Sequence, residues 1–122
     1  MSNTIAFPKA YAFVLESRFI GLFAKMVHSA KCTIEMDVRD WQYSPYKDVV
    51  DELGRLKASA STVSTTLNLE LTREALLEVL KALAYTIWLF IERGRETHDD
   101  EGYSNAEYQV LYFKLSKDYI GI

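Results

Sequence analysis

The feature that most constrains the fold of this chain is a long apolar segment, Leu76 to Ile91. On a helical wheel, the polar side chains in and beside it fall within a stripe only about 60° wide. The stripe contains Glu74, Glu78, Lys81, Tyr85 and Glu92. Such a helix must be covered on most of its sides to remove its apolar surface from water. We therefore expect either the rest of the chain or a second copy of it to pack against this segment.

Both ends of this helix carry recognisable signals. Thr72 is a suitable N-cap, and Glu74 in the first turn complements the helix dipole. Gly94 offers a C-terminal cap, and the polar stretch from Arg95 to Ser104 reads as a loop. The pattern predicts a helix that begins after Thr72 and ends near Gly94.

A second helix is predicted from Pro45 to about residue 57. Ser44 can cap free backbone N–H groups, and Pro45 suits the first helical position. The apolar residues that follow have helical spacing: Tyr46, Val49, Val50, Leu53 and Leu56. Gly54 within this helix costs up to about 1 kcal/mol relative to alanine.

Three segments have patterns typical of strands. Apolar and polar residues alternate from Cys32 to Arg39 and from Val63 to Leu71, as in strands with one face in water. The run from Glu107 to Leu115 has large side chains on both sides. That pattern favours a central strand covered on both faces.

The N-terminal third changes its periodicity near Glu16 and Ser17. Residues 19 to 30 form an amphipathic helical pattern, but the same wheel extended backward places Glu16 in the apolar arc. We therefore predict a strand over residues 9 to 16, with Tyr11, Phe13 and Leu15 on one face, and then a helix capped by Ser17. A single long helix from Pro8 is the alternative.

These elements predict one domain over residues 1–122, without an internal repeat. The expected fold is an α+β two-layer sandwich, with about three helices on one face of a four-stranded, mixed or antiparallel sheet. A parallel, doubly wound sheet is the alternative. It is less favoured because two of the strand patterns have a polar face.

Charge and cysteine content limit the function classes. The net charge is -3 and the pI is about 5.4, whereas nucleic-acid binding needs clustered Lys and Arg. Cys32 is the only cysteine, so no intramolecular disulfide can form. The sequence shows no signal peptide pattern and no apolar run long enough to span a bilayer. We expect a cytoplasmic protein that binds neither nucleic acid nor membrane.

The candidate catalytic and metal-binding residues lack the neighbouring groups that catalysis or metal binding requires. His28 and Cys32 could form a nucleophilic pair, but Cys32 is expected on the inner face of a strand. Three carboxylates that could act in acid–base catalysis, Glu35, Asp37 and Glu70, are expected on solvent-exposed strand faces, where polar residues are common. The loop from Glu96 to Glu101 could hold a cation, although acidic surface loops are common. We therefore expect no catalytic residue, no metal and no cofactor.

An aromatic segment between acidic residues is the favoured binding surface. Trp and Tyr are frequent interface anchors, and acidic neighbours attract a basic partner. The candidate residues are Asp37, Asp40, Trp41, Tyr43, Tyr46, Asp48 and Asp51. The stretches from Glu35 to Glu52 and from Glu92 to Glu107 each carry a net charge of -4. If the two adjoined, they would form one strongly negative face.

Three functions follow as hypotheses. The first is a small acidic protein-binding or inhibitory module that associates stoichiometrically with a larger, basic protein partner. The second is a structural or regulatory homo-oligomer, such as a homodimer, formed through the helix from Leu76 to Ile91. The third is an enzyme without a recognisable motif.

Overall fold

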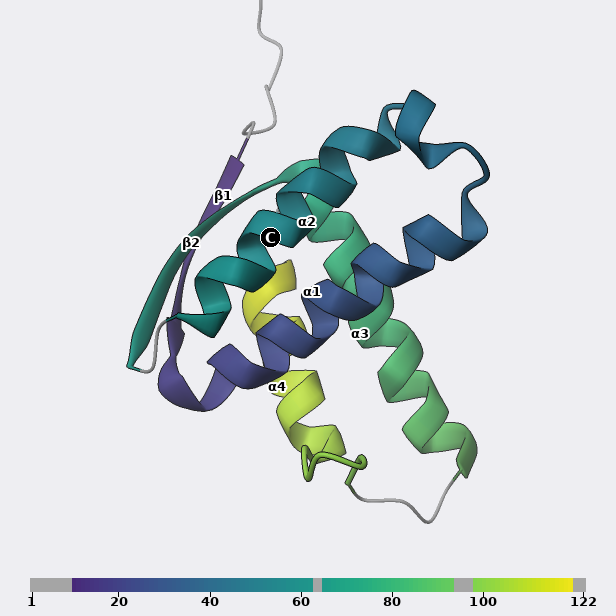
Figure 1. Cartoon of the computed structure of the whole chain (residues 1–122). Helices are drawn as coiled ribbons and strands as arrows, with labels where there is room; N and C mark the ends of the chain where they lie inside the picture. Colours follow the sequence, from purple (N-terminus) through teal and green to yellow (C-terminus); the bar gives the residue numbers. More distant parts are fainter. Residues whose placement is uncertain (1–9, 63–64, 94–97, 120–122) are drawn as a thin grey trace, which may run out of the picture.

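The structure is a computed structural model that describes residues 10–62, 65–93 and 98–119. Two antiparallel strands lie on one side of the molecule and four α-helices pack on one face of them (Figure 1). In chain order the elements are β1 (Ala10–Glu16), α1 (Ser17–Asp37), the 3-10 turn η1 (Trp41–Tyr43), α2 (Tyr46–Ser61), β2 (Thr66–Thr72), α3 (Arg73–Arg93) and α4 (Asn105–Tyr119). No helix within the described residues is both long and apolar enough to cross a membrane.

The strand residues alternate between the core and solvent. Tyr11, Phe13 and Leu15 of β1 are buried, and so are Leu67, Leu69 and Leu71 of β2. The residues between them face away from the helices. Full burial of each leucine contributes roughly 1.5–3 kcal/mol, so the two-stranded ribbon is stabilised mainly by the helices beneath it.

Each strand runs directly into a long helix that returns across the ribbon. Ser17 begins α1 immediately after Glu16, and Arg73 begins α3 immediately after Thr72. The predicted N-cap role of Thr72 is confirmed, since its Oγ1 accepts a hydrogen bond from the Ala75 amide at 3.3 Å. The predicted cap at Ser17 is wrong: Ser17 lies inside α1, and Glu16 precedes the helix without a side-chain cap.

The fold contains an internal structural repeat of one strand and two helices. Ser17 and Arg73, the first residues of α1 and α3, lie 56 positions apart. Phe13 and Leu69, which pair at the centre of the antiparallel ladder, have the same separation. An approximate two-fold axis through this pair therefore relates β1, α1 and α2 to β2, α3 and α4.

Burial and packing both follow this two-fold axis. α1 contacts β2 and α4, and α3 contacts β1 and α2 as the symmetry requires. The pairs of buried residues related by the axis are Tyr11 and Leu67, Phe13 and Leu69, Leu15 and Leu71, Phe19 and Ala75, Ile20 and Leu76, Phe23 and Val79, Val27 and Leu83, and Ile34 and Phe90. The sequence itself shows no repeat, so this symmetry is found only at the level of structure.

The predicted strand from Cys32 to Arg39 is wrong, because α1 continues to Asp37. Val27, Ala30 and Ile34 extend the buried stripe of α1 at helical spacing. Met36, which the alternating pattern placed inside, is 82% exposed. Burial of one face along the longer α1 therefore stabilises a helix here more than the short alternating pattern favours a strand.

The predicted strand from Glu107 to Leu115 is also wrong, because this segment belongs to α4. Its buried residues Tyr108, Leu111 and Leu115 are spaced as on one helix face. Ser104 and Glu107 form a capping box: the Ser104 hydroxyl accepts from the Glu107 amide, and the Glu107 carboxylate accepts from the Ser104 amide, each at 3.2 Å.

The expected four-stranded sheet with three helices is therefore contradicted. The protein is α+β, but its described part has four α-helices and a two-stranded antiparallel sheet. Strand β1, the helix after Ser44 and the helix after Thr72 are confirmed, whereas two predicted strands are helical. Gly94, the predicted cap of α3, and residues 63 and 64 of the predicted strand lie outside the described residues.

Candidate functional site

The surface predicted to bind a partner surrounds the connection between α1 and α2. The residues are Asp37 at the end of α1, Asp40 before η1, Trp41 and Tyr43 in η1, and Tyr46, Asp48 and Asp51 in α2. Tyr43 is 90% exposed, whereas Trp41 is half-buried and packs against the core. The three aromatic residues therefore do not form one exposed cluster. Tyr43 and Tyr46 are the members that solvent reaches.

The two acidic stretches do not form a single face. The η1 turn and the start of α2 lie at one end of the molecule, and the loop before α4 lies at the other (Figure 1). Carboxylates within each stretch also have cationic neighbours. Lys47 lies 2.8 Å from Asp51, and Lys25 lies 2.6 Å from Asp99. The Lys47 hydrogen bond lowers the pKa of Asp51 below its usual value, despite an opposing desolvation effect.

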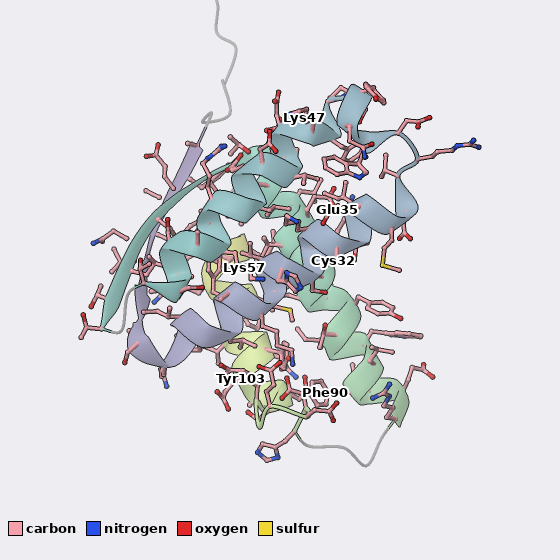
Figure 2. All side chains as sticks on the ribbon, viewed as in Figure 1. Cys32, Glu35, Lys47, Lys57, Phe90 and Tyr103 are labelled. Atoms are coloured by element: carbon pink, nitrogen blue, oxygen red, sulfur yellow. The ribbon has the colours of Figure 1, made fainter. Side chains whose placement is uncertain are left out.

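Cys32 lies on α1 and Lys57 on the neighbouring helix α2 (Figure 2), and His28 of α1 contacts both. The Cys32 Sγ is 3.5 Å from His28 Nε2, and Lys57 Nζ is 3.0 Å from His28 Nδ1. An ammonium group can only donate, so Nδ1 must accept and Nε2 carries the proton toward sulfur. A catalytic Cys–His pair usually has a carboxylate or amide at the position that Lys57 fills. The geometry therefore gives His28 no orienting anion.

The carboxylates considered for acid–base chemistry are not brought together. Glu35 lies on α1 and pairs with Lys31 at 2.9 Å, whereas Glu70 lies on the solvent side of β2. In the described part of the acidic loop, Asp99 is engaged by protein donors. No group of three or more His, Cys, Asp or Glu side chains suited to a metal occurs among the described residues.

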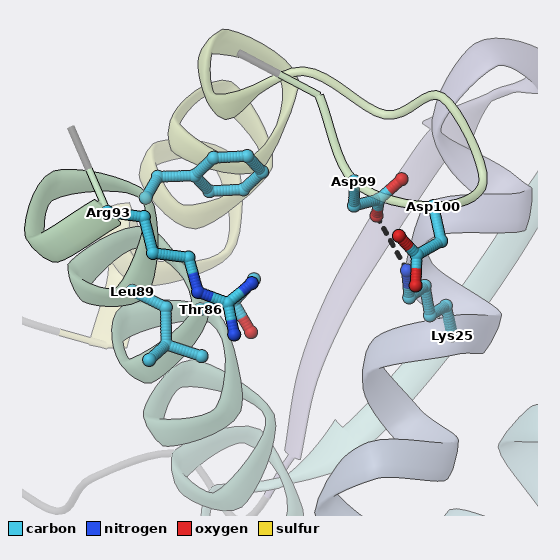
Figure 3. A pocket seen from close by; sticks show the side chains of 7 residues that line it. Lys25, Thr86, Leu89, Arg93, Asp99 and Asp100 are labelled. Carbon is cyan, nitrogen blue, oxygen red and sulfur yellow. Dashed lines mark hydrogen bonds and ion pairs between the residues drawn. The ribbon is translucent and has the colours of Figure 1, made fainter. Parts of the chain in front are cut away.

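A polar cluster joins this loop to α1 beside a cavity of about 120 Å³ (Figure 3). Asp99 Oδ2 accepts from Lys25 and from the buried Tyr108 hydroxyl, and its Oδ1 accepts from the amides of Glu101 and Tyr103. Burial opposes ionisation of Asp99, but the hydrogen bonds from Lys25 and Tyr108 lower its pKa to about 2. The carboxylate is fully engaged, so its role is to hold the loop.

The same cluster changes the titration of its partners. Burial and the hydrogen bond to Asp99 raise the pKa of Tyr108 to about 12. Burial lowers the pKa of Lys25, but its bonds to Asp99 and Tyr108 outweigh that effect and raise it above the usual value. Sequence patterns did not identify this cluster, because Lys25 and Asp99 are 74 positions apart.

An apolar groove of about 390 Å³ lies between α3 and α4. Its lining is formed by Ala84, Ile87, Trp88, Ile91, Gln109, Tyr112 and Phe113. Five large apolar side chains on these two helices are between 47% and 73% exposed: Tyr85, Trp88, Ile91, Val110 and Phe113. The Tyr85 and Trp88 rings are 5.9 Å apart. We call the groove lined by these seven residues the α3–α4 groove; Tyr85 and Val110 are not part of its lining.

The two-fold axis relates the α3–α4 groove to a second one between α1 and α2. Lys31 and Glu35 stand where α3 has Ile87 and Ile91, at the separation of 56 positions. Buried Val50 and Leu53 correspond to Tyr108 and Leu111, which makes Asp51 and Arg55 the equivalents of Gln109 and Phe113. The α1–α2 groove therefore has charged residues where the α3–α4 groove has Ile87, Ile91 and Phe113, although Trp41 and Val50 also line it.

The predicted burial of the segment from Leu76 to Ile91 holds for only part of it. Leu76, Val79, Leu80 and Leu83 are buried by the rest of the chain. The second half of the segment presents Tyr85, Trp88 and Ile91 to solvent. The chain thus leaves part of its most apolar helix uncovered.

Comparison with protein-family models, with curated proteins and with solved structures finds no match to this chain.

Proposed function

We propose that this chain is a non-enzymatic protein-binding module that acts by stoichiometric association. Its docking surface is the α3–α4 groove, and the partner presents an apolar helical surface to it. Grooves between packed helices accept the side-chain ridge of another helix. The exposed Trp88, Ile91 and Phe113 supply the large apolar side chains that act as anchors in such contacts.

The observation that carries this proposal is the difference between the two related grooves. Both lie between a long helix and the helix that follows it, and both border solvent. The α1–α2 groove has the charged residues expected of a hydrated surface, such as Lys31 and Glu35. The helical framework therefore does not require Ile87 and Ile91 at the equivalent positions. A binding role accounts for apolar residues there.

The size of the exposed patch supports the same conclusion. Three of its large side chains, Trp88, Ile91 and Phe113, line the groove and expose on the order of 400 Å² together, within the range of the largest patch on typical monomers. Burial of such surface is favourable by roughly 25 cal/mol per Å². A partner that covers it gains part of that free energy, because association also has an entropic cost.

The η1 region remains a second candidate surface. Tyr43 projects into solvent three residues after Asp40, and Asp48 lies in the first turn of α2. This arrangement fits the recognition of a basic partner, in which acidic residues increase the association rate. An inhibitory role of the module would then consist of covering a basic surface of that partner.

Affinity capture with matched variants tests the proposal. Phe113→Glu places a charge in the α3–α4 groove, and Arg55→Glu changes the equivalent position in the α1–α2 groove. A protein retained by the native chain and by Arg55→Glu, but lost with Phe113→Glu, supports docking in the α3–α4 groove. Equal retention by both variants contradicts it. Tyr43→Ala in the same series measures the contribution of the η1 region.

A further inference from the structure

We infer that the partner of the α3–α4 groove is a second copy of this chain, docked antiparallel about a two-fold axis perpendicular to α3. The inference rests on the proposed binding role of that groove and adds the identity of the occupant. It is carried by the self-complementary pattern of charged and apolar residues on the exposed side of α3.

Glu74 and Glu78 lie near the N-terminus of α3, and the part of its exposed side from Lys81 to Glu92 has opposite charges at its two ends. Lys81, Tyr85, Trp88 and Glu92 follow one another at spacings of four, three and four residues, so they lie on one stripe of the helix. All four are exposed, and Trp88 also lines the α3–α4 groove. Lys81 and Glu92 are separated by about 16 Å along the helix axis. The stripe is therefore positive at one end, aromatic in the middle and negative at the other.

A stripe of this kind is complementary to itself when it is reversed. A two-fold axis midway between Lys81 and Glu92 places Lys81 of each copy opposite Glu92 of the other, with Tyr85 and Trp88 between them. Lys81 also pairs with Glu78 at 3.4 Å within the chain, but its side chain is 61% exposed. The Glu78 side chain is only 15% exposed, so the inferred contact keeps this pair, and the Lys81 ammonium group has further donors for Glu92 of the other copy.

The charge distribution also permits two acidic chains to meet on this surface. The described residues that line the α3–α4 groove include no carboxylate. The first acidic stretch lies at the η1 end of the molecule; the second begins with Glu92, which faces Lys81 of the other copy in the inferred contact, and continues into the loop that contains Asp99. Like-charge repulsion between copies is therefore weak where the inferred contact forms.

The exposed apolar area is sufficient for a dimer. A standard interface buries about 800 Å² on each partner, and somewhat more than half of that area is apolar. The exposed side chains Trp88, Ile91 and Phe113 of the α3–α4 groove supply roughly 400 Å². A contact between two copies therefore needs only the polar rim in addition.

Light scattering and analytical ultracentrifugation of the full chain, from about 1 µM to about 1 mM, test this inference. We expect a monomer–dimer equilibrium in the native chain. Trp88→Glu should raise the dimer dissociation constant at least about thirtyfold, the effect of losing an interface anchor. Arg55→Glu, at the equivalent of Phe113 in the α1–α2 groove, should leave the constant unchanged. Circular dichroism confirms that each variant is folded.

Charge reversal tests the antiparallel arrangement. Lys81→Glu and Glu92→Lys should each weaken the dimer by roughly three- to tenfold, because each brings like charges together at two places. The double variant restores both pairs with reversed polarity and should recover the native constant. Failure of the double variant to recover it overturns the antiparallel docking.

A native chain that stays monomeric up to about 1 mM, or a dimer that Trp88→Glu leaves intact, overturns the inference. The proposed binding function fails separately. A monomeric chain that still captures another protein through Phe113 would retain that function with a different occupant. Loss of both self-association and capture would remove both conclusions.

Discussion

Lys25 Nζ lies 2.6 Å from Asp99 Oδ2 and joins the middle of α1 to the loop that precedes α4. The side chains of both residues are largely shielded from solvent, at 27% and 13% exposed. The ion pair is therefore less screened than one on an open surface. It fixes the loop on which the position of α4, and hence of Phe113, depends.

Replacement of Asp99 by Asn should destabilise the fold by about 1–3 kcal/mol, because Lys25 loses its counter-charge and two hydrogen bonds weaken. Urea unfolding followed by circular dichroism measures this change. Glu101→Gln is the matched control, since Glu101 lies 3.3 Å from Lys25 but is 60% exposed. Its effect should stay within about 0.5 kcal/mol. Equal effects of the two variants would contradict the role given to Asp99.

Stability should decline in acid as Asp99 becomes protonated. The pKa of Asp99 is lowered to about 2 in the folded state, so the ionised form favours folding. Its contribution is present in full above about pH 4 and is lost as the pH falls toward 2; it amounts to about 2 kcal/mol. Urea unfolding at several pH values should show this decline in the native chain. The decline should be reduced in Asp99→Asn.

Stability should also decline in strong base. The pKa of Tyr108 is raised to about 12, so the folded state favours the neutral phenol. This contribution is present below about pH 10, the usual tyrosine value, and is lost as the pH rises toward 12. Tyr108→Phe should lower stability at neutral pH by removing the bond to Asp99. A Tyr108→Phe slope between pH 10 and 12 as steep as the native one would refute this assignment.

The two helical glycines should respond in opposite ways to alanine. A Cβ on Gly54 would meet Lys31 Cε at 3.7 Å, an ordinary contact, so Gly54→Ala should stabilise the fold by up to about 1 kcal/mol. A Cβ on Gly21 would collide with the Tyr103 hydroxyl, so Gly21→Ala should lose that gain. Thermal unfolding of both variants, and of Gly21→Ala combined with Tyr103→Phe, measures the difference. The Tyr103→Phe background should restore the gain at Gly21.

The helices with caps and long apolar faces could be predicted from the sequence, as α2 and α3 show. The failures arose where two periodicities compete over a short window. Residues 32 to 38 alternate like a strand, yet Ile34 continues the buried stripe of α1. In α4, the Ser104 and Glu107 capping box was a local helix signal that the strand prediction overlooked.

The structural repeat was not visible in the sequence for a physical reason. Between residues 10–37 and 66–93, only Leu15 with Leu71 and Lys25 with Lys81 are identical pairs. What the halves share is which positions are buried, and many apolar residues satisfy burial equally well. The α3–α4 groove was missed for a different reason, because only the pairing of α3 with α4 shows which apolar residues stay uncovered.

The charged lining of the α1–α2 groove has a consequence for the size of any assembly. A chain with an apolar docking groove on each of its two halves could bind further copies through both and grow into an open fibre. Lys31, Glu35, Asp51 and Arg55 make one of those grooves hydrophilic. Association through the other groove about a two-fold axis buries the docking surface of both molecules. No docking surface then remains for a third copy, and the assembly closes as a dimer.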